Sequence, residues 1–371
     1  MSKIKILHAA DLHLDSPFEA LSAGKAAIRR QEQRQLLSSL AELAGAEQVD
    51  LVLLSGDLLD SGNTYYETGE ELIRSLQEIQ APVFIAPGNH DFYSPKSPYA
   101  RLQLPENVHI FREKAIRFVS LPRLNARVYG AAFTENQSGP LLRDFHAERK
   151  EGVWNLLCLH GEVGNRDSVY DPISLEDLAQ SGMDYAALGH IHKASGLQKA
   201  GSTWYSWPGC PEGRGFDETG EKTVSIVTLS RTDCELRAVS IASRRYETLR
   251  VDVTGKDPLL AIHTSLPDDT VRDVYRITLT GETEATPELR RLQANLSELF
   301  FELQLRDETR LRRDVWERAG DDSLRGLFLR RLKERYDAAE SDRDKLRIEQ
   351  AARWGLAALD NGEEVVRHDD P

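Results

Sequence analysis

The stretch Gly88-Asn89-His90-Asp91 follows directly after the apolar segment 82–86. Within one tight turn it offers an amide oxygen, an imidazole and a carboxylate. In α/β sheets, sites form in the crevice beyond the carboxyl ends of the strands. The string therefore predicts a functional loop at the end of a strand, and it directs attention to the ends of the other strands.

Four further apolar segments, 3–9, 49–55, 154–159 and 185–188, are each followed by residues of the same kind. These residues are Asp11-Leu12-His13, Gly56-Asp57, His160-Gly161 and His190-Ile191-His192. Alternate residues of an extended segment point to the same side, so His190 and His192 can face one site. A single histidine or aspartate after a strand is usually a cap or a turn residue, but five such loops in one chain favour a shared metal site.

Amphipathic helices are expected between these strands. The segment 26–44 places Leu36, Leu37, Leu40 and Leu43 on one face, and the segment 68–79 carries a similar stripe. Strands that alternate with helices predict an α/β layered sandwich. A hairpin pair, 223–229 and 234–241, is expected to close this domain, which we place at residues 1–241.

The rest of the chain divides into two further expected regions. Residues 246–306 show strand, helix, strand, helix and strand patterns and predict a small α+β domain. Residues 307–371 are charged and helical, with apolar residues at helical spacing among many arginines. That pattern has two interpretations, an amphipathic face packed on its own core or a docking segment for a partner coiled coil.

Composition limits the classes of protein. No apolar run approaches the roughly 20 residues that span a bilayer, and the N-terminus lacks the pattern of a signal peptide, so we expect a cytoplasmic protein without a membrane partner. Three widely separated cysteines predict no disulfide framework. The formal net charge of −13 argues against a general electrostatic grip on nucleic acid, although two bound divalent ions would dominate the local field.

The order and spacing of the polar loops resemble the calcineurin-like metallophosphoesterase superfamily. Within this resemblance, which covers about two thirds of the chain, the segments 10–17 and 208–216 look like the SbcD-type DNA nuclease subunits, especially the YhaO branch. The resemblance implies a four-layer αββα sandwich. It also implies that the α+β domain caps the metal site and helps to admit nucleic acid.

The resemblance assigns a role to each residue of the predicted site. His90 would stabilise the transition state and assist the leaving oxygen, Asp91 would orient His90, and Asp60 would support the site from behind. One metal ion would be held by Asp11, His13, Asp57 and His192, and the other by Asp57, Asn89, His160 and His190, with Asp57 as the bridge.

The predicted cofactor is a pair of divalent ions. The mixture of carboxylate, amide and imidazole ligands suits Mn²⁺, Fe²⁺ or Zn²⁺ better than Ca²⁺, and the resemblance favours Mn²⁺. Arg214 is either a bidentate contact for a substrate phosphate or an exposed turn arginine. Cys210 stands where many relatives carry a small polar residue, and its effect is left open.

The resemblance implies a metal-dependent DNA phosphodiesterase, of exonuclease type, that acts in DNA repair. Its partners would be DNA and an SbcC-like coiled-coil ATPase subunit that binds the C-terminal helices; a homodimer is also compatible with the sequence. The chief alternative is a phosphatase or small-molecule phosphodiesterase of the same superfamily, which the acidic charge suits better. A non-catalytic scaffold for an ATPase is disfavoured because no predicted ligand is missing.

Overall fold

The computed structural model describes residues 3–312 and 314–361. It divides into two compact units. The first comprises Met1–Leu249, Pro267–Ile277 and Gln293–Gln304, and the second comprises Arg250–Leu266, Thr278–Leu292 and Leu305–Pro371.

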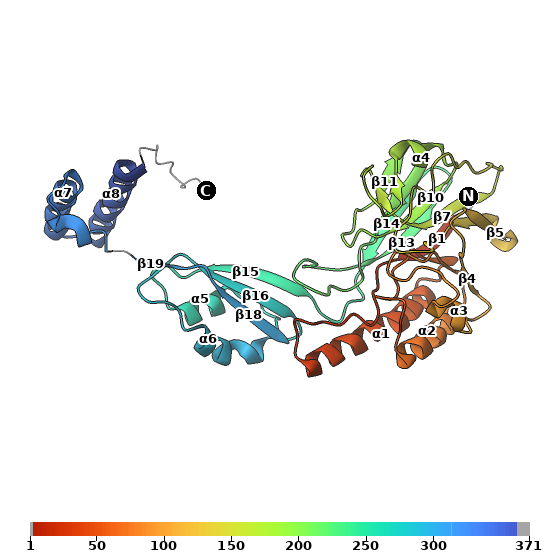
Figure 1. Ribbon diagram of the computed structural model, residues 1–371, viewed down its shortest axis with the longest axis horizontal. Helices are drawn as coiled ribbons and strands as arrows, with labels where there is room; N and C mark the ends of the chain where they lie inside the picture. Colours follow the sequence, from red (N-terminus) through yellow and green to blue (C-terminus); the bar gives the residue numbers. More distant parts are fainter. Residues whose placement is uncertain (1–2, 313, 362–371) are drawn as a thin grey trace. The chain divides into compact units, whose positions relative to one another are not determined.

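Two six-stranded sheets form the body of the first unit (Figure 1). The first sheet has the order β14-β13-β1-β2-β3-β4, in which β1 to β4 are parallel and β13 and β14 are antiparallel. Its strands are β1 (Ile4–Ala9), β2 (Leu51–Leu54), β3 (Val83–Ile85), β4 (Val108–Ile110), β13 (Val224–Leu229) and β14 (Cys234–Val239).

The second sheet has the order β11-β12-β10-β7-β6-β5, with a parallel centre and antiparallel edges. Its strands are β5 (Arg117–Leu121), β6 (Ala126–Gly130), β7 (Trp154–His160), β10 (Tyr185–Gly189), β11 (Gln198–Ala200) and β12 (Thr203–Ser206). A short separate pair joins β8 (Glu162–Val163) to β9 (Pro172–Ile173). The strands β5, β6, β11 and β12, of which β5 and β11 form the edges of this sheet, were not predicted.

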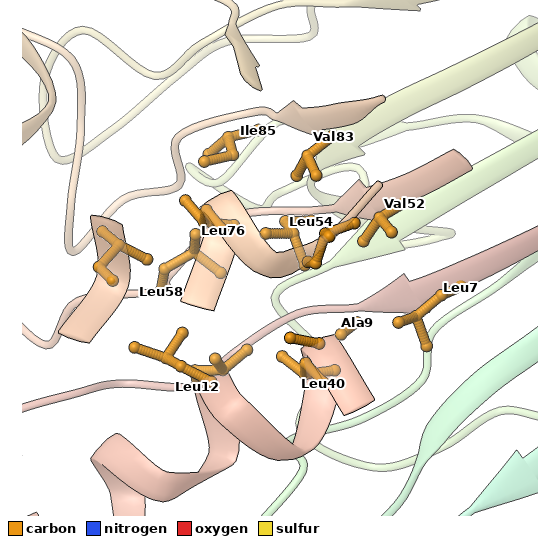
Figure 2. Packing of buried hydrophobic residues seen from close by; sticks show 14 of the residues in the cluster. Leu7, Ala9, Leu12, Leu40, Val52, Leu54, Leu58, Leu76, Val83 and Ile85 are labelled. Carbon is orange, nitrogen blue, oxygen red and sulfur yellow. The ribbon is translucent and has the colours of Figure 1, made fainter. Parts of the chain in front are cut away.

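Helices cover the outer faces of both sheets. On the first sheet, α1 (Ala23–Ala46) and α2 (Tyr66–Glu78) pack on a buried cluster in which Leu40 and Leu76 approach Val52 and Leu54 (Figure 2). On the second sheet lies α4 (Leu175–Gln180), whose Leu178 is fully buried. The short helices α3 (Pro98–Arg101) and η1 (Pro122–Leu124) lie in connections.

A second core lies between the two sheets. Ile6, Leu53 and Phe84 from the first sheet pack with Leu156 and Tyr185 from the second. All of these side chains are almost completely buried, and each buried aliphatic or aromatic side chain contributes about 1.5–3 kcal/mol. The layers therefore run helix, sheet, sheet, helix, and the predicted α/β sandwich fold is confirmed.

The remaining elements follow the predicted order of strands and helices. A three-stranded sheet, β15-β16-β18, accompanies α5 and α6, and the tail forms two helices, α7 and α8. The bounds are β15 (Tyr246–Asp252), α5 (Pro258–Ser265), β16 (Val274–Thr280), β17 (Glu282–Thr283), α6 (Leu289–Leu296), η2 (Ser297–Leu299), β18 (Glu302–Asp307), β19 (Arg310–Leu311), η3 (Glu317–Gly320), α7 (Leu324–Ala338) and α8 (Asp342–Asn361). Among the described residues, no helix is long and apolar enough to cross a membrane.

Candidate metal centre

The loops after β1 and β2 form the floor of the centre. The amide of Asp11 donates to the carbonyl oxygen of Gly56 at 3.0 Å, and the amide of His13 donates to that of Asp57 at 2.9 Å. The two loops thus continue the pairing of their parallel strands beyond the strand ends. This pairing brings Asp11, His13 and Asp57, all buried, to the same edge of the sheet.

The backbone is strained at four of the seven predicted ligands. The φ angles of Asp11, His13, Asp57 and His190 are 56°, 45°, 51° and 95°. Residues other than glycine rarely adopt positive φ, and such strain costs about 1–3 kcal/mol per residue and clusters at functional sites. The surrounding fold therefore holds these side chains in directions that local preference would not select.

The first group of ligand atoms comes from Asp11, His13 and His192. Nε2 of His13 lies 3.1 Å from Nε2 of His192, and Nε2 of His192 lies 3.8 Å from Oδ1 of Asp11. All three ligand atoms lie within 4.8 Å of one another. They therefore converge on a volume that one ion would fill.

The second group comes from Asn89, His160 and His190. Nε2 of His160 lies 3.0 Å from Oδ1 of Asn89. The ring of His190 lies beside that of His160, with 5.3 Å between centroids, and the ring of Tyr170 covers His190 at 4.9 Å. An amide oxygen and two imidazoles are thus gathered on the other side of Asp57.

Asp57 lies between the two groups. Its Oδ2 is 3.8 Å from Nε2 of His13 and 3.3 Å from Nε2 of His160. Its Oδ1 accepts a hydrogen bond from the amide of His90 at 2.9 Å, which fixes the plane of the carboxylate. One carboxylate that faces both groups has the position that a bridging ligand needs.

Three of the imidazoles are held through Nδ1 by an oxygen acceptor. Nδ1 of His13 lies 3.1 Å from Oδ1 of Asp60, Nδ1 of His160 lies 2.9 Å from the carbonyl oxygen of Ser55, and Nδ1 of His192 lies 2.6 Å from Oε1 of Glu218. Such hydrogen bonds set the tautomer and the orientation of metal-binding histidines. Each ring therefore presents Nε2 to the centre.

Glycines keep space free around the ligands. A Cβ atom on Gly88 would lie 2.3 Å from Oδ1 of Asp57, and one on Gly189 would lie 1.8 Å from the carbonyl oxygen of Ser55 and 2.8 Å from Nδ1 of His160. These distances are shorter than real Cβ contacts, so the backbone could not approach the ligands with any larger residue.

The charges of the centre are linked. Burial raises the pKa of Asp11 to about 6. Burial opposes ionisation of Asp57 as well, but His160 holds the pKa of that carboxyl below its usual range. Burial opposes protonation of His160, yet Asp57 raises its pKa to about 9. A metal ligand must be a neutral imidazole, so an ion bound at Nε2 would displace this proton.

His90 lies on the exposed side of the centre. Its Nδ1 donates to the carbonyl oxygen of Asp60 at 3.1 Å, and one of its ring nitrogens lies within 4.8 Å of ligand atoms of His13 and Asp57. Asp91, in contrast, is buried, and its carboxylate accepts hydrogen bonds from the amides of Leu58 and Gly88 at 2.7 and 2.8 Å and from the hydroxyl of Tyr99. Asp91 thus holds the loop that carries Asp57, whereas the carbonyl of Asp60 holds the ring of His90.

Two residues beyond β12 complete the centre. Arg214 contacts Asp60 at 3.2 Å and Glu218 at 2.8 Å, and its side chain is 21% exposed. Glu218 was not predicted from the sequence, although this carboxylate follows Arg214 by four residues in the same loop.

Cys210 is buried with its amide 3.2 Å from the carbonyl oxygen of His192, and burial raises the pKa of its thiol to about 12, so it packs as a neutral side chain.

The donor set fits two divalent ions. The seven predicted ligands comprise two carboxylates, one amide oxygen and four imidazoles. Asp57 lies close to His13 of the first group and to His160 of the second, and the ligand atoms of Asp11, Asp57 and His160 also lie within 4.8 Å of one another. Imidazole-rich sets with few oxygens suit transition metals. The carboxylates are buried whereas Asn89, His90, His190 and His192 are more exposed, so the centre opens to solvent beside these four residues.

Comparisons with known proteins agree with this geometry. The calcineurin-like phosphoesterase family model matches residues 4–194. The uncharacterized metallophosphoesterase YhaO of Bacillus subtilis is 32% identical over 72% of this chain and 68% of its own length.

Two other relatives are more distant. The DNA double-strand break repair protein Mre11 of Methanosarcina acetivorans is 26% identical over 69% of this chain and 41% of its own length. A component of the nuclease SbcCD of Bacillus subtilis is 25% identical over 60% of this chain and 66% of its own length. The family match and the similarity to YhaO establish that the chain belongs to the calcineurin-like phosphoesterase family.

Proposed function

We propose that this chain is a metal-dependent DNA phosphodiesterase of exonuclease type that acts in DNA repair with two Mn²⁺ ions. One observation carries the hydrolytic part of the proposal: Asp57 faces two groups of ligand atoms, and a ring nitrogen of the exposed His90 lies within 4.8 Å of ligand atoms of His13 and Asp57. Similar proteins named for DNA repair and for a nuclease support DNA as the substrate.

The protein's own residues would divide the work as follows. The two ligand groups would hold ions that neutralise charge on the phosphate oxygens and make a water molecule acidic enough to attack phosphorus. His90, anchored by the carbonyl oxygen of Asp60, would donate a hydrogen bond or a proton from Nε2 to the substrate oxygens. Asp91 would keep the Asp57 loop at the right distance through its backbone hydrogen bonds.

The α+β domain and the tail are part of the same proposal. Residues 246–306 would cap the site and help to admit DNA, and residues 307–371 would dock an SbcC-like coiled-coil ATPase. Exposed apolar side chains on α7 and α8 support the docking: Leu324, Leu327, Leu346 and Trp354 are 70%, 50%, 56% and 40% exposed. A coiled-coil partner would cover such side chains.

The net charge of −13 favours a second candidate, a phosphatase or small-molecule phosphodiesterase with the same metal chemistry. An acidic surface repels a polyanion, whereas a small phosphate ester approaches only the metal centre. The two candidates differ in substrate and share the ligands.

The test uses the purified full chain with end-labelled linear DNA and, in parallel, a chromogenic phosphodiester, each with Mn²⁺, Mg²⁺ or EDTA. We expect Mn²⁺-dependent cleavage of DNA. His90→Ala should keep the metal and lower the rate of cleavage about 10²–10⁴-fold. The control is His263→Ala, which changes an exposed histidine on α5 and should cut normally.

Other outcomes would change the assignment. Turnover of the small diester with intact DNA, also after addition of a coiled-coil ATPase partner, would favour the second candidate. Normal cleavage by His90→Ala would contradict the role of His90.

A further inference from the structure

A short loop after β12 folds around a single carboxylate. The amide of Arg214 donates to Oε2 of Glu218 at 2.8 Å, and Nε of Arg214 lies 3.3 Å from the same oxygen. The side chain of Glu218 is only 5% exposed. A carboxylate that is removed from water in this way needs charged partners, and the loop supplies one of them.

Glu218 belongs to a chain of polar contacts that ends on two predicted ligands. His192 donates from Nδ1 to Oε1 of Glu218 at 2.6 Å. The guanidinium of Arg214 donates to Oε1 of Glu218 at 2.8 Å and to Oδ1 of Asp60 at 3.2 Å. Oδ1 of Asp60 accepts in turn from Nδ1 of His13 at 3.1 Å. A cluster of three residues therefore connects the two imidazoles of the first ligand group from behind. We call Asp60, Arg214 and Glu218 the support cluster.

The second ligand group is held differently. His160 donates from Nδ1 to the backbone carbonyl of Ser55, and its Nε2 faces Asn89. A carboxylate increases the donor strength of an imidazole more than a neutral carbonyl does, because its full negative charge favours positive charge on the ring. The support cluster thus acts on one of the two ligand groups.

We infer that Glu218 is a positioning residue for the ion held by Asp11, His13 and His192, and that Arg214 links it to Asp60 instead of gripping substrate phosphate. This inference rests on the proposed two-ion function. The guanidinium of Arg214 already contacts both carboxylates, and a planar fork sets the distance between them. These two carboxylates already engage Nε and both terminal nitrogens of Arg214, so its side chain is held as a link between them.

The experiment measures Mn²⁺ binding to the metal-free full chain by calorimetry, with bound Mn²⁺ counted by elemental analysis. The wild-type chain should bind two ions. Glu218→Ala should weaken one of them by about 10–100-fold and leave the other unchanged. Glu218→Gln should lose less Mn²⁺ affinity, because its amide oxygen still accepts a hydrogen bond from Nδ1 of His192. This variant also tests the inference if Glu218→Ala does not fold.

Two further variants identify the ion. Asn89→Ala removes an oxygen from the second group and should weaken the other ion, so that the double variant with Glu218→Ala weakens both. The control is Glu221→Gln, which changes an exposed carboxylate three residues further along and should bind as the wild type does. Arg214→Gln should weaken the same ion as Glu218→Ala.

Each outcome has one meaning. Wild-type affinity for both ions in Glu218→Ala, or an equal loss at both, would overturn the inference and leave the proposed function intact. A variant Arg214→Gln that binds both ions normally but binds DNA more weakly would return Arg214 to substrate contact. A wild-type chain that does not bind two ions would overturn the proposed function, and the inference with it.

Discussion

Arg29 on α1 is the test case for how the region behind the metal centre is held together. Its side chain is completely buried, stacks near Phe18, and binds Oε1 of Glu212 at 2.9 Å and the carbonyl oxygen of Gly213 at 3.1 Å. Its third partner is Glu32. Because Glu212 and Gly213 immediately precede Arg214, this ion pair anchors the loop of the support cluster to α1.

The substitution Arg29→Met keeps most of the side-chain volume but removes the charge. Glu32 would keep Arg244 as a partner, whereas the 2% exposed Glu212 would keep only the amides of Ser243 and Arg244. Breaking a buried pair while one charge remains costs about 3–5 kcal/mol. We therefore expect the free energy of unfolding to fall by about that amount at neutral pH.

The assay is equilibrium unfolding in urea, followed by circular dichroism in EDTA so that bound metal does not contribute. The double variant Arg29→Met/Glu212→Gln also removes the unpaired charge of Glu212. Its loss of unfolding free energy should therefore be smaller, by about 1–3 kcal/mol, than the sum of the losses in the two single variants. Burial already raises the pKa of Glu212. Without Arg29 the pKa should rise further, and since a raised acid pKa stabilises the fold at low pH, the loss in Arg29→Met should shrink as the pH falls.

Two results would refute this reasoning. The first is a loss below about 1 kcal/mol for Arg29→Met, which is the range of exposed pairs. The second is simple additivity in the double variant, which would mean that the charge of Glu212 is not left unpaired.

Three further outcomes are expected. Burial lowers the pKa of His8 to about 3, so the unfolded chain binds the proton more tightly, and the stability that the neutral ring provides is present above pH 6.5 and is lost as the pH falls. In unfolding titrations, His8→Gln should reduce the slope of stability against pH between pH 6.5 and 4 by up to about 1.4 kcal/mol per pH unit. Gly189→Ala should destabilise the folded protein by about 1–3 kcal/mol or more and weaken Mn²⁺ binding, because its Cβ would meet the carbonyl oxygen of Ser55. Gly45→Ala is the control: its Cβ meets nothing within 4 Å, so this variant should be neutral or stabilising, and equal losses of stability in the two variants would contradict the packing argument. Mn²⁺ at 100 times its dissociation constant should stabilise by about 2.7 kcal/mol per ion, and a melting temperature that EDTA leaves unchanged would speak against bound metal.

Local patterns were enough to predict the framework of the protein. Short apolar segments ending in Asp, Asn or His appear in the structure as β1, β2, β3, β7 and β10, and the helices between them as α1 and α2. The edge strands β5 and β11 were missed. Edge strands lack the continuous apolar run of buried parallel strands, so periodicity alone separates them poorly from loops.

The candidate centre shows the same division at the level of single residues. The sequence by itself determined which side chains stand at the strand ends, since that depends on neighbours only a few positions apart. Tertiary structure alone decided what lies behind them: Glu218 on His192, Arg214 on Asp60, and Arg29 on Glu212, a pair 183 residues apart in the chain. Such pairs depend on which helices and loops the fold brings together, and a local pattern carries no record of a partner far along the chain.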